Sequence, residues 1–413
     1  MKKIRMIYGM VFIASFLFGM ISFYQNSEAK VLATDVSQAS DGCVLVGIEG
    51  SYKEDASDYV KRVNEIRQEA CSKGYPDPRD PSRALTQDDY VPIQWSKDLQ
   101  YLARIRAAEA IVNPSHTRTN GKSCFSVKSQ NDVSSSGEVL AWGGDGISLW
   151  YGEKADWVSQ NDNAVTGHYT SMINPGNIYM GISYFISDFG SWSNCYAGEF
   201  SSAEGLDTTP MGNEKNIIQI IEVSKEKMGG FAIYSSDNTY RINKKKSKAL
   251  SLKAQTDYDG SKSHVNYLGE VSWSSSDSSI ASIDAKGKVT GKKYGTAVIR
   301  AAYDGTSATK KVTVQPVLKN VYFTYASGGK KKIRVSWNKG SKGITGYQIQ
   351  YSTNYYFKKN KKTLTIKGRN KTSKVIKKLK KKKLYYIRIR SYIKDGKNKY
   401  YSSWNFNGMV YTK

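Results

Sequence analysis

The chain has 413 residues, with 62 lysines and arginines against 36 aspartates and glutamates, and a formal net charge of +26. This length exceeds one ordinary core and suggests two to three domains. From Pro316 onward there are 27 basic residues and one acid, whereas the first 315 residues hold 35 of each sign. This distribution excludes a polycation spread over the whole chain, and the excess charge must be explained in the terminal segment.

Residues 1–29 predict a secretory signal peptide. A basic start precedes an uncharged, mostly apolar run over residues 6–24, and Ser27-Glu28-Ala29 supplies a small-residue cleavage site. We expect cleavage after Ala29 or after Ala33. The alternative is an uncleaved anchor, because the apolar run is near the about 17 to 25 residues that span a bilayer. We therefore expect an extracellular protein that is secreted or associated with the cell surface.

Four cysteines, Cys43, Cys71, Cys124 and Cys195, lie in the first half of the chain. An exported chain with an even number of cysteines permits two disulfides, and four cysteines allow three pairings. We expect Cys43 to pair with Cys71 and Cys124 with Cys195. Their spacing fits neither a zinc ribbon nor a CxxC redox motif.

The first predicted elements after the signal are a leader and two helices. Residues 30–53 show no helical period and are interpreted as a leader. Residues 56–70 and 97–111 place apolar side chains at steps of three and four, which predicts amphipathic helices. Ser96 is a suitable N-cap for the second helix, and the alanine-rich face of that helix can approach other backbone closely.

The rest of the first domain mixes helix and strand. After Pro114 and a polar loop, residues 137–142 read as a segment that enters the core, and residues 147–160 have helical spacing. Residues 179–185 and 195–200 are strand-like. This order predicts an α+β or three-layer domain of about 150 residues.

Past residue 202 the pattern changes to that of an all-β protein. Residues 203–216 are rich in turn residues and are interpreted as a linker. Short alternating strands then recur at intervals of roughly 8 to 12 residues, which is typical of β-sandwiches. We expect one such domain over residues 217–316 and a second over residues 317–413.

Only three histidines occur in the chain, and two of them lie in the first domain with nearby carboxylates. His116, Glu138 in GEV, Glu153 in WYGEKADW and His168 in GHYTSMINP follow one another in this order. The third histidine, His264, lies in a polar hairpin-like stretch and is assigned no chemistry. Imidazole titrates near neutrality and is the commonest metal ligand, so the first two are candidates for chemistry.

The order and the residues of these four motifs resemble those of the CAP superfamily, the domain shared by cysteine-rich secretory proteins, antigen 5 and plant pathogenesis-related proteins of group 1. The resemblance covers about residues 54–202. It implies an α-β-α sandwich whose central cleft gathers the two histidines and two glutamates. The chain departs from the family at Val139, where Asn is common, and at residues 171–175, where an apolar run with Trp is common. Relatives have been linked to sterol or lipid binding and to proteolysis.

Two further resemblances cover the all-β part. The stretch VSWSSSDSSIASID over residues 271–284, followed by Gly287-Lys288-Val289-Thr290-Gly291, resembles a bacterial Ig-like domain of group 2. Val335-Ser336-Trp337, GYQIQY over residues 346–351, LYYIRIR over residues 384–390 and Ser402-Ser403-Trp404 resemble a fibronectin type III domain. Both folds serve as spacers or adhesive modules, and the fold alone assigns neither an activity.

Two imidazoles and two carboxylates around one cleft can act in three ways. They can hold zinc or another divalent cation, with His116 and His168 as ligands. They can act as general acid and base, or they can form a polar network that fixes a binding cleft. No nucleophile stands out, because Ser134, Ser135 and Ser136 form no GxSxG elbow.

We expect the main role to be binding of an extracellular ligand, which could be a lipid, a glycan, a protein or a divalent cation. The alternative is a metal-assisted, protease-like hydrolase with Glu138 or Glu153 as the base. Four aromatic residues could line a groove, although their helical spacing favours core packing. They are Trp142, Trp150, Trp157 and Tyr169.

The basic end carries lysine runs at residues 358–362 and 377–383, with tyrosines between them. Such a surface can bind polyanions. Because export makes nucleic acid an unlikely partner, we expect an anionic cell-wall polymer, acidic polysaccharide or anionic lipid. The hypothesis is electrostatic retention at the cell surface, and a truncation ending near Gln315 that stayed surface-associated at low salt would contradict it. The alternative is that the lysines only solvate the sandwich and discourage edge pairing.

Overall fold

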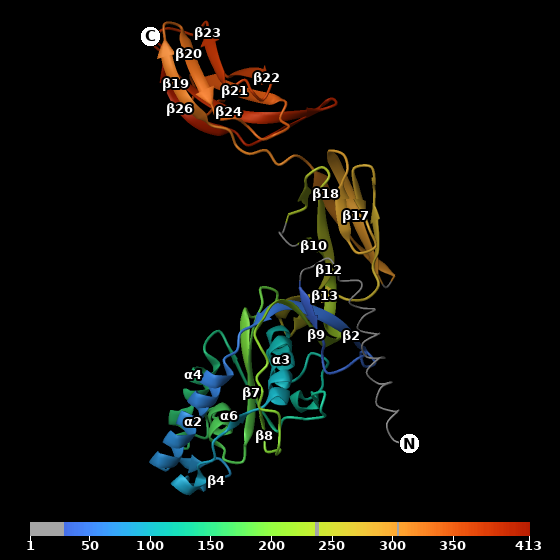
Figure 1. Ribbon diagram of the computed structural model, residues 1–413, viewed down its shortest axis with the longest axis vertical. Coiled ribbons are helices and arrows are strands. Elements are labelled where there is room, and N and C mark those ends of the chain that lie inside the picture. Colours follow the sequence, from blue (N-terminus) through green and yellow to red (C-terminus); the bar gives the residue numbers. More distant parts are fainter. Residues whose placement is uncertain (1–28, 236–238, 304) are drawn as a thin grey trace.

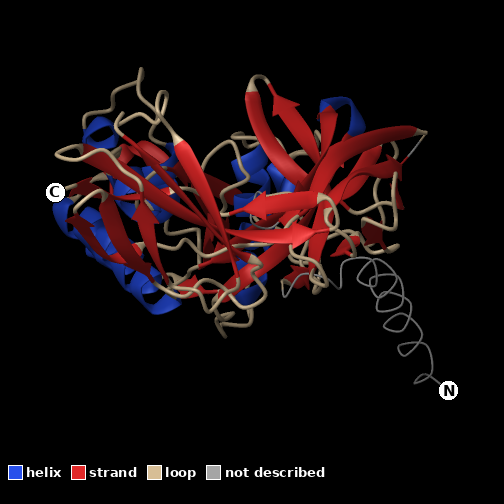
Figure 2. Ribbon diagram, turned by 90° about the horizontal axis from the view of Figure 1, so that it is seen from above, coloured by secondary structure: helices blue, strands red, loops and turns tan. Residues whose placement is uncertain are grey.

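The computed structural model describes residues 29–235, 239–303 and 305–413. The predicted signal peptide lies outside these ranges apart from Ala29, and it stays a prediction. Within the described ranges, no helix combines the length and apolar character needed to cross a bilayer. Figure 1 shows a region of helices and strands followed by two regions of strands, and strands dominate the view in Figure 2.

The first domain contains all of the α-helices in the described ranges. They are α2 (Ala56–Lys73), α3 (Lys97–Val112), α4 (Gly146–Tyr151), α5 (Lys154–Val158) and α6 (Gly167–Ile173). The side chain of Asp55 accepts a hydrogen bond from the backbone of Asp58 at the start of α2, and Gly74 ends that helix in a left-handed conformation. Ser96 caps α3 by accepting from the backbone of Leu99, as its sequence position predicts.

The helices cover both faces of one sheet. Its strands are β1 (Lys30–Leu32), β2 (Cys43–Tyr52), β5 (Gln94–Trp95), β6 (Gly137–Trp142), β7 (Tyr179–Ile186), β8 (Asn194–Ser201) and β9 (Glu214–Ser224). The order β6-β8-β7-β2-β9-β1 runs across the sheet, and β5 pairs in parallel with β7. One core cluster joins the sheet to α3, and the other joins it to α2, α4 and α6. The predicted three-layer α-β-α arrangement is confirmed.

Helix α3 packs directly on the middle of the sheet because the residues on both facing surfaces have small side chains or none. Ala103, Ala107 and Ala108 are fully buried in its core cluster. A Cβ atom at Gly181 of β7 would lie 2.0 Å from the backbone nitrogen of Gln100, so only glycine permits this approach. The close contact fixes α3, and with it the loop that follows the helix, relative to β6 and β8.

Residues 30–53 differ from the leader that the sequence predicted. They form β1 and β2, and β2 pairs with β9 along nearly its whole length. Val46, Ile48 and Tyr52 are fully buried, so β2 is a structural part of the first domain. The predicted linker over residues 203–216 likewise ends inside β9, which begins at Glu214.

The second domain packs two sheets around a core of its own. Its strands are β10 (Met228–Ser235), β11 (Arg241–Ile242), β12 (Ser247–Tyr258), β13 (Ser261–Tyr267), β14 (Ser272–Ser275), β15 (Ala281–Ile283), β16 (Lys288–Gly291), β17 (Gly295–Tyr303) and β18 (Thr306–Val314). Strand β13 also pairs with β2, with Asn266 opposite Gly47 and Tyr267 opposite Val46. One sheet of this domain therefore continues into the sheet of the first domain.

The third domain is a β-sandwich with a separate core. Its smaller sheet has the order β19 (Phe323–Gly329), β20 (Lys332–Trp337) and β23 (Ser373–Lys377). Its larger sheet has the order β22 (Lys362–Lys367), β21 (Gly346–Ser352), β24 (Leu384–Asp395) and β25 (Asn398–Tyr401), and β26 (Asn405–Tyr411) also pairs with β24. The two predicted all-β sandwiches are thus confirmed.

The predicted disulfides are wrong, because all four cysteines are free thiols in the structure. Cys71 belongs to the core between the sheet and α2, whereas Cys43 begins β2. Cys195 is buried on the α3 side of the sheet, and Cys124 lies in the loop after α3. An even number of cysteines permits disulfides, but it does not bring the sulfur atoms together.

Candidate functional site

The four sequence-predicted residues come from four separate elements of the first domain. His116 lies in the loop after α3, which ends before Asn113 and Pro114. Glu138 is the second residue of β6, and Glu153 lies between α4 and α5. His168 is in the first turn of α6. The sheet and the helices on both of its faces are therefore needed to assemble the site.

The first histidine–carboxylate pair is His116 with Glu138. Nδ1 of His116 lies 2.7 Å from Oε1 of Glu138, whose side chain is 1% exposed against 55% for the imidazole. The guanidinium of Arg106, which is fully buried, donates to both oxygens of Glu138 at 2.5 and 3.2 Å. Burial alone would raise the pKa of Glu138, but His116 and Arg106 outweigh it and hold the pKa below its usual range.

The second pair is His168 with Glu153. Oε1 of Glu153 bonds Nδ1 of His168, and Oε2 accepts from the backbone nitrogens of His168 and Tyr169 at 3.0 and 3.1 Å. These donors belong to the first turn of α6, where a carboxylate also interacts favourably with the helix dipole. One side chain thus fixes both the start of the helix and the orientation of the imidazole.

The two pairs meet in one place. The rings of His116 and His168 are stacked, with centroids 6.3 Å apart and an interplanar angle of 28°. Since an ionised carboxylate only accepts hydrogen bonds, each Nδ1 donates its proton to a glutamate, and in a neutral imidazole of this tautomer the lone pair lies on Nε2. Among the described residues, neither Nε2 has a protein partner. The arrangement can present two neutral imidazoles to one small ligand or ion.

Sequence reasoning missed three residues beside this site, namely Arg106, Cys124 and Glu199. Glu199 of β8 lies directly opposite Glu138 of β6 in the antiparallel register, so both side chains lie on the same face. It is 1% exposed, and it lies beside Glu138 and Ser135. Burial, with the nearby charge of Glu138, raises the pKa of Glu199 well above its usual range. Only the register between β6 and β8 identifies Glu199 as a neighbour of Glu138.

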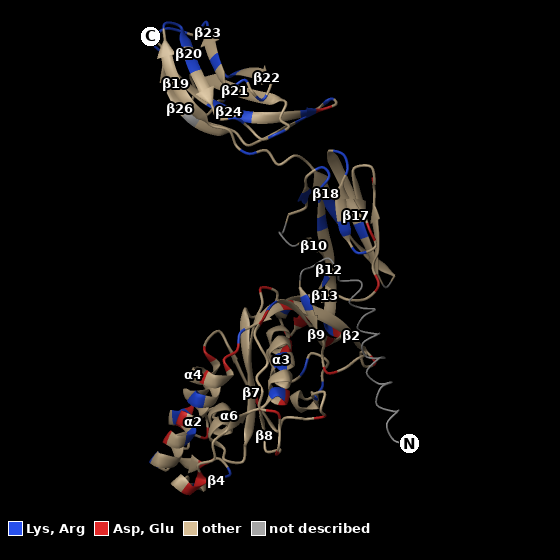
Figure 3. Ribbon diagram, viewed as in Figure 1, with Lys and Arg blue, Asp and Glu red and all other residues tan. Residues whose placement is uncertain are grey.

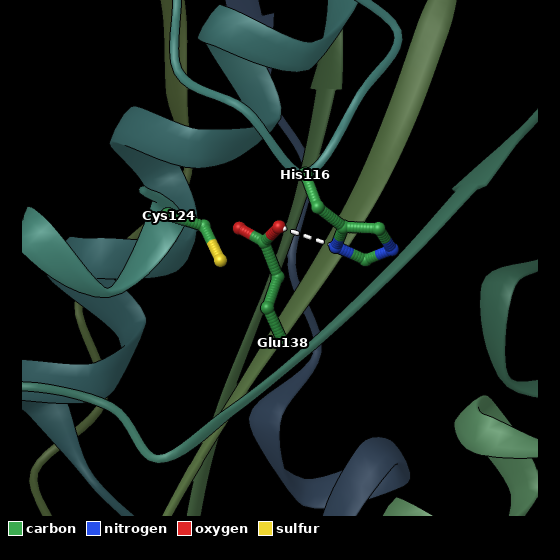
Figure 4. A group of neighbouring side chains, drawn as sticks. All are labelled: His116, Cys124 and Glu138. Carbon is green, nitrogen blue, oxygen red and sulfur yellow. Dashed lines mark hydrogen bonds and ion pairs between the residues drawn. The ribbon is translucent and has the colours of Figure 1, made fainter. Parts of the chain in front are cut away.

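Cys124 forms a second possible ligand group with His116 and Glu138, whose ligand atoms all lie within 4.8 Å of one another. Figure 4 shows the carboxylate of Glu138 between the thiol and the imidazole. Burial and the charges of Glu138 and Glu199 raise the pKa of Cys124 to about 11, so the thiol is protonated at neutral pH. Glu138 also accepts hydrogen bonds from Arg106, which compete with an ion for its oxygens.

The aromatic residues singled out in the sequence are structural at two positions. Trp150 is 1% exposed and donates from Nε1 to the carbonyl of Leu140 at 3.1 Å, and Tyr169 is fully buried. Trp142 and Trp157 are partly buried, and each indole nitrogen donates to a backbone carbonyl. This bonding agrees with core packing, which the helical spacing favoured.

Comparison with known families divides the chain into three parts. Residues 60–198 match the cysteine-rich secretory protein family, CAP. Residues 238–314 match the bacterial Ig-like domain of group 2, and residues 316–405 match the fibronectin type III domain. The chain carries a CAP domain, a bacterial Ig-like domain and a fibronectin type III domain. This order confirms the arrangement predicted from the sequence, and it indicates an extracellular or surface protein.

Individual relatives are similar over limited regions. An "S-layer-related protein" from Niallia circulans is 31% identical over 102 residues, which is 25% of this chain and 6% of that protein. Domains 4 and 5 of the S-layer protein SbsC align over 45% of this chain and 98% of that chain, at 14% identity and a TM-score of 0.20. An intimin mutant of EHEC O157:H7 aligns over 24% of this chain and 52% of that chain, at 20% identity and a TM-score of 0.17. Neither solved structure assigns a function here.

Proposed function

We propose that the protein is a secreted or cell-surface binding protein whose CAP cleft takes an extracellular ligand. The ligand that the geometry supports best is a divalent cation such as zinc. The observation that carries this proposal is the pair of imidazoles, each held at Nδ1 by a carboxylate, with ring centroids 6.3 Å apart. Hydrogen bonding of Nδ1 to a carboxylate is the usual way in which proteins orient a metal-binding histidine.

His116 and His168 would hold the cation, and Glu138 and Glu153 would keep both rings in the required tautomer. When bound, zinc supplies a fixed positive charge that can polarise an oxygen of a bound molecule. The His116 ring is 55% exposed and that of His168 is 22% exposed, so a ligand from solution can reach them. Lipid, glycan and protein ligands are alternatives for the same cleft.

The competing function is a metal-assisted hydrolase with Glu138 or Glu153 as general base. Both carboxylates are already engaged in the structure, because Glu138 pairs with Arg106 and Glu153 accepts two backbone hydrogen bonds at the start of α6. A general base must be able to take up a proton from a water in the cleft. These bonds occupy the carboxylate oxygens that would have to accept the proton, and therefore favour binding over catalysis.

The β-sandwich domains would display the CAP domain and retain it at the surface. Of the 28 charged side chains from Pro316 onward, 27 are basic. Figure 3 shows basic residues on strands and loops of the third domain, whereas both signs mix in the first. This segregation supports electrostatic affinity for an anionic surface polymer.

Zinc binding by the full chain tests the proposal. We expect His168→Ala to weaken the affinity measured by calorimetric titration by at least about tenfold. His264→Ala provides the matched control, because this histidine lies on β13 of the Ig-like domain and should leave the affinity unchanged. Equal zinc affinity in wild type and His168→Ala would refute the cation site. Zinc-dependent hydrolysis that is lost in Glu153→Gln would favour the enzyme instead.

A further inference from the structure

The larger sheet of the fibronectin type III domain carries an exposed aromatic cluster on its outer face. Its members, called the aromatic platform below, are Tyr355, Tyr356, Tyr386 and Phe406. The ring centroid of Tyr355 lies 5.1 Å from that of Tyr356, 5.4 Å from that of Tyr386 and 5.3 Å from that of Phe406. Tyr355, Tyr356 and Phe406 are 52%, 71% and 43% exposed.

The alternation of β24 places the platform outside the domain core. Tyr385, Ile387 and Ile389 point inward and are buried, whereas Tyr386 and the two arginines that follow at alternate positions lie on the outer face. Large exposed aromatic clusters are uncommon on soluble domains and mark interaction sites. The aromatic platform is therefore a candidate binding surface.

Two arginines extend the platform along the same strand. The guanidinium of Arg388 lies 4.3 Å from the ring centroid of Phe357 and 4.7 Å from that of Trp404. The guanidinium of Arg390 lies 3.6 Å from the ring centroid of Tyr401 and 4.2 Å from that of Trp404. These cation–π contacts hold the two side chains against the sheet and limit their freedom.

No carboxylate of the described chain neutralises these arginines. Arg388 donates from Nε and Nη2 to Oε1 of Gln350, and Arg390 donates in the same way to Oε1 of Gln348. Both acceptors are neutral amides, so the two positive charges remain available to an anion. The one acid of the domain, Asp395, lies at the far end of β24 from Tyr386.

The two lysine-rich loops flank the same end of the sheet. One loop follows β21, the other precedes β24, and these strand ends are adjacent because Ser352 pairs with Tyr386. Nζ of Lys358 lies 5.9 Å from the ring centroid of Tyr356. The platform thus combines flat apolar rings with a dense and unneutralised positive charge.

We propose that the aromatic platform binds an acidic polysaccharide. The apolar C–H face of a sugar ring packs on an exposed aromatic ring, and the acidic groups of the chain pair with the arginines and the nearby lysines. A bare polyanion would use the charge and leave the rings unoccupied, whereas a neutral glycan would leave the charges unmatched. This inference rests on the proposed surface retention, and it assigns that role a site and a ligand class.

The test uses the full chain and three immobilised probes. Polygalacturonate offers sugar rings with carboxylates, poly-L-glutamate offers carboxylates without sugar rings, and phosphatidylglycerol vesicles offer an anionic lipid surface. The double variant Tyr355→Ala/Phe406→Ala removes two rings of the platform. Its matched control is Tyr322→Ala/Tyr325→Ala, which removes two tyrosines that are 47% and 52% exposed in the same domain, the second of them on the other sheet.

We expect the platform variant to lose at least about tenfold in polygalacturonate affinity and to keep its poly-L-glutamate affinity within about twofold. The control should keep both. Tyr355→Phe, which retains the ring, should bind like wild type, and retained poly-L-glutamate affinity in the platform variant excludes a folding defect. Unchanged polygalacturonate affinity in the platform variant, or an equal loss for both polymers, would overturn the proposal.

The remaining outcomes separate this inference from the proposed function. Wild type that binds poly-L-glutamate and polygalacturonate equally, with no effect of the platform variant, would leave charge-based retention standing and refute the platform. Wild type that binds no anionic probe would refute both. Tighter binding to the vesicles, lost in the platform variant, would overturn the polysaccharide and identify the platform as a lipid-binding face.

Discussion

The CAP domain and the fibronectin type III domain use charged side chains in opposite ways. In the CAP domain, Arg104, Arg106 and Arg118 are almost fully buried, and each pairs with at least one carboxylate. In the fibronectin type III domain, Arg388 and Arg390 stack on aromatic rings and hydrogen-bond to neutral glutamines. Charge fixes internal geometry in the first domain, and it remains available to a partner in the third.

This difference matters because one of the buried arginines contacts the histidine site directly. Arg106 bonds Glu109 on its own helix and Glu138 on β6, and it therefore links α3 to the carboxylate that orients His116. A buried guanidinium is stable only while its partners remain. Four measurements on the two domains test this difference.

The largest effect is expected from Arg106→Met. This change leaves Glu109 with Arg118 alone and Glu138 with His116 alone, and loss of one partner of a buried ion pair typically costs about 3 to 5 kcal/mol. We expect the free energy of unfolding of the CAP domain to fall by that amount in denaturant titrations that follow this domain. A loss below about 1 kcal/mol would show that the buried network does not hold the domain together.

A smaller effect is expected from Glu153→Gln. The amide can still accept hydrogen bonds from the start of α6, but it no longer carries the negative charge that stabilises the Nδ1 proton of His168. Loss of such a supporting group typically lowers metal affinity by about 10- to 100-fold. Zinc titration of the full chain measures this, and an affinity equal to that of wild type would contradict the role assigned to Glu153.

Acidification should also separate the two domains. Hydrogen bonds from arginine side chains are the leading cause that holds the pKa values of Asp77 and Asp145 below 3.8. The contribution of these two carboxylates to the stability of the folded domain is therefore present above pH 3.8, and it is lost as the pH falls through their folded-state pKa values. Asp145 is partly exposed, and we expect a loss on the order of 1 kcal/mol in the CAP domain between pH 5 and pH 3. The fibronectin type III domain has one acidic side chain and should change less. Hydrogen exchange, corrected for the intrinsic rate at each pH, resolves the domains, and equal losses would contradict the comparison.

The smallest effect is expected from Arg388→Met, the counterpart of Arg106→Met. Arg388 is only partly buried, it has no carboxylate partner among the described residues, and it hydrogen-bonds to one glutamine. We expect the fibronectin type III domain to lose about 1 kcal/mol or less. A loss as large as that of Arg106→Met would show that both arginines serve internal structure, and the contrast would disappear.

Periodicity and capping predicted two helices of the CAP domain, whereas α6, which carries His168, was not predicted. Helices α2 and α3 follow the spacing of their apolar residues, and Ser96 caps α3 as predicted. The two histidines and two glutamates that the structure brings together lie in distinctive motifs that are separated along the chain. Each of these features depends on local chemistry, which a single sequence displays.

The features that were missed depend on contacts between distant segments. Strand β2 was not predicted because Gly47 and Gly50 interrupt its apolar pattern. The structure requires a small residue at position 50, since a Cβ atom there would lie 2.3 Å from the side chain of Phe185. Glu199 becomes a neighbour of Glu138 only through the register of β6 and β8. The even number of cysteines predicted two disulfides, but the four thiols are free in the folded structure. Register and layer assignment are tertiary properties, and local pattern does not contain them.

The central claim is that two carboxylates present the Nε2 atoms of His116 and His168 to a shared ligand. Nitrogen-15 NMR of the histidine rings in the full chain tests it most directly, because protonated and unprotonated ring nitrogens differ in chemical shift. We expect a proton on Nδ1 of both rings, and zinc-induced shifts of both Nε2 signals with none at His264. Protonated Nε2 atoms, or a zinc response confined to one of the two rings, would contradict it.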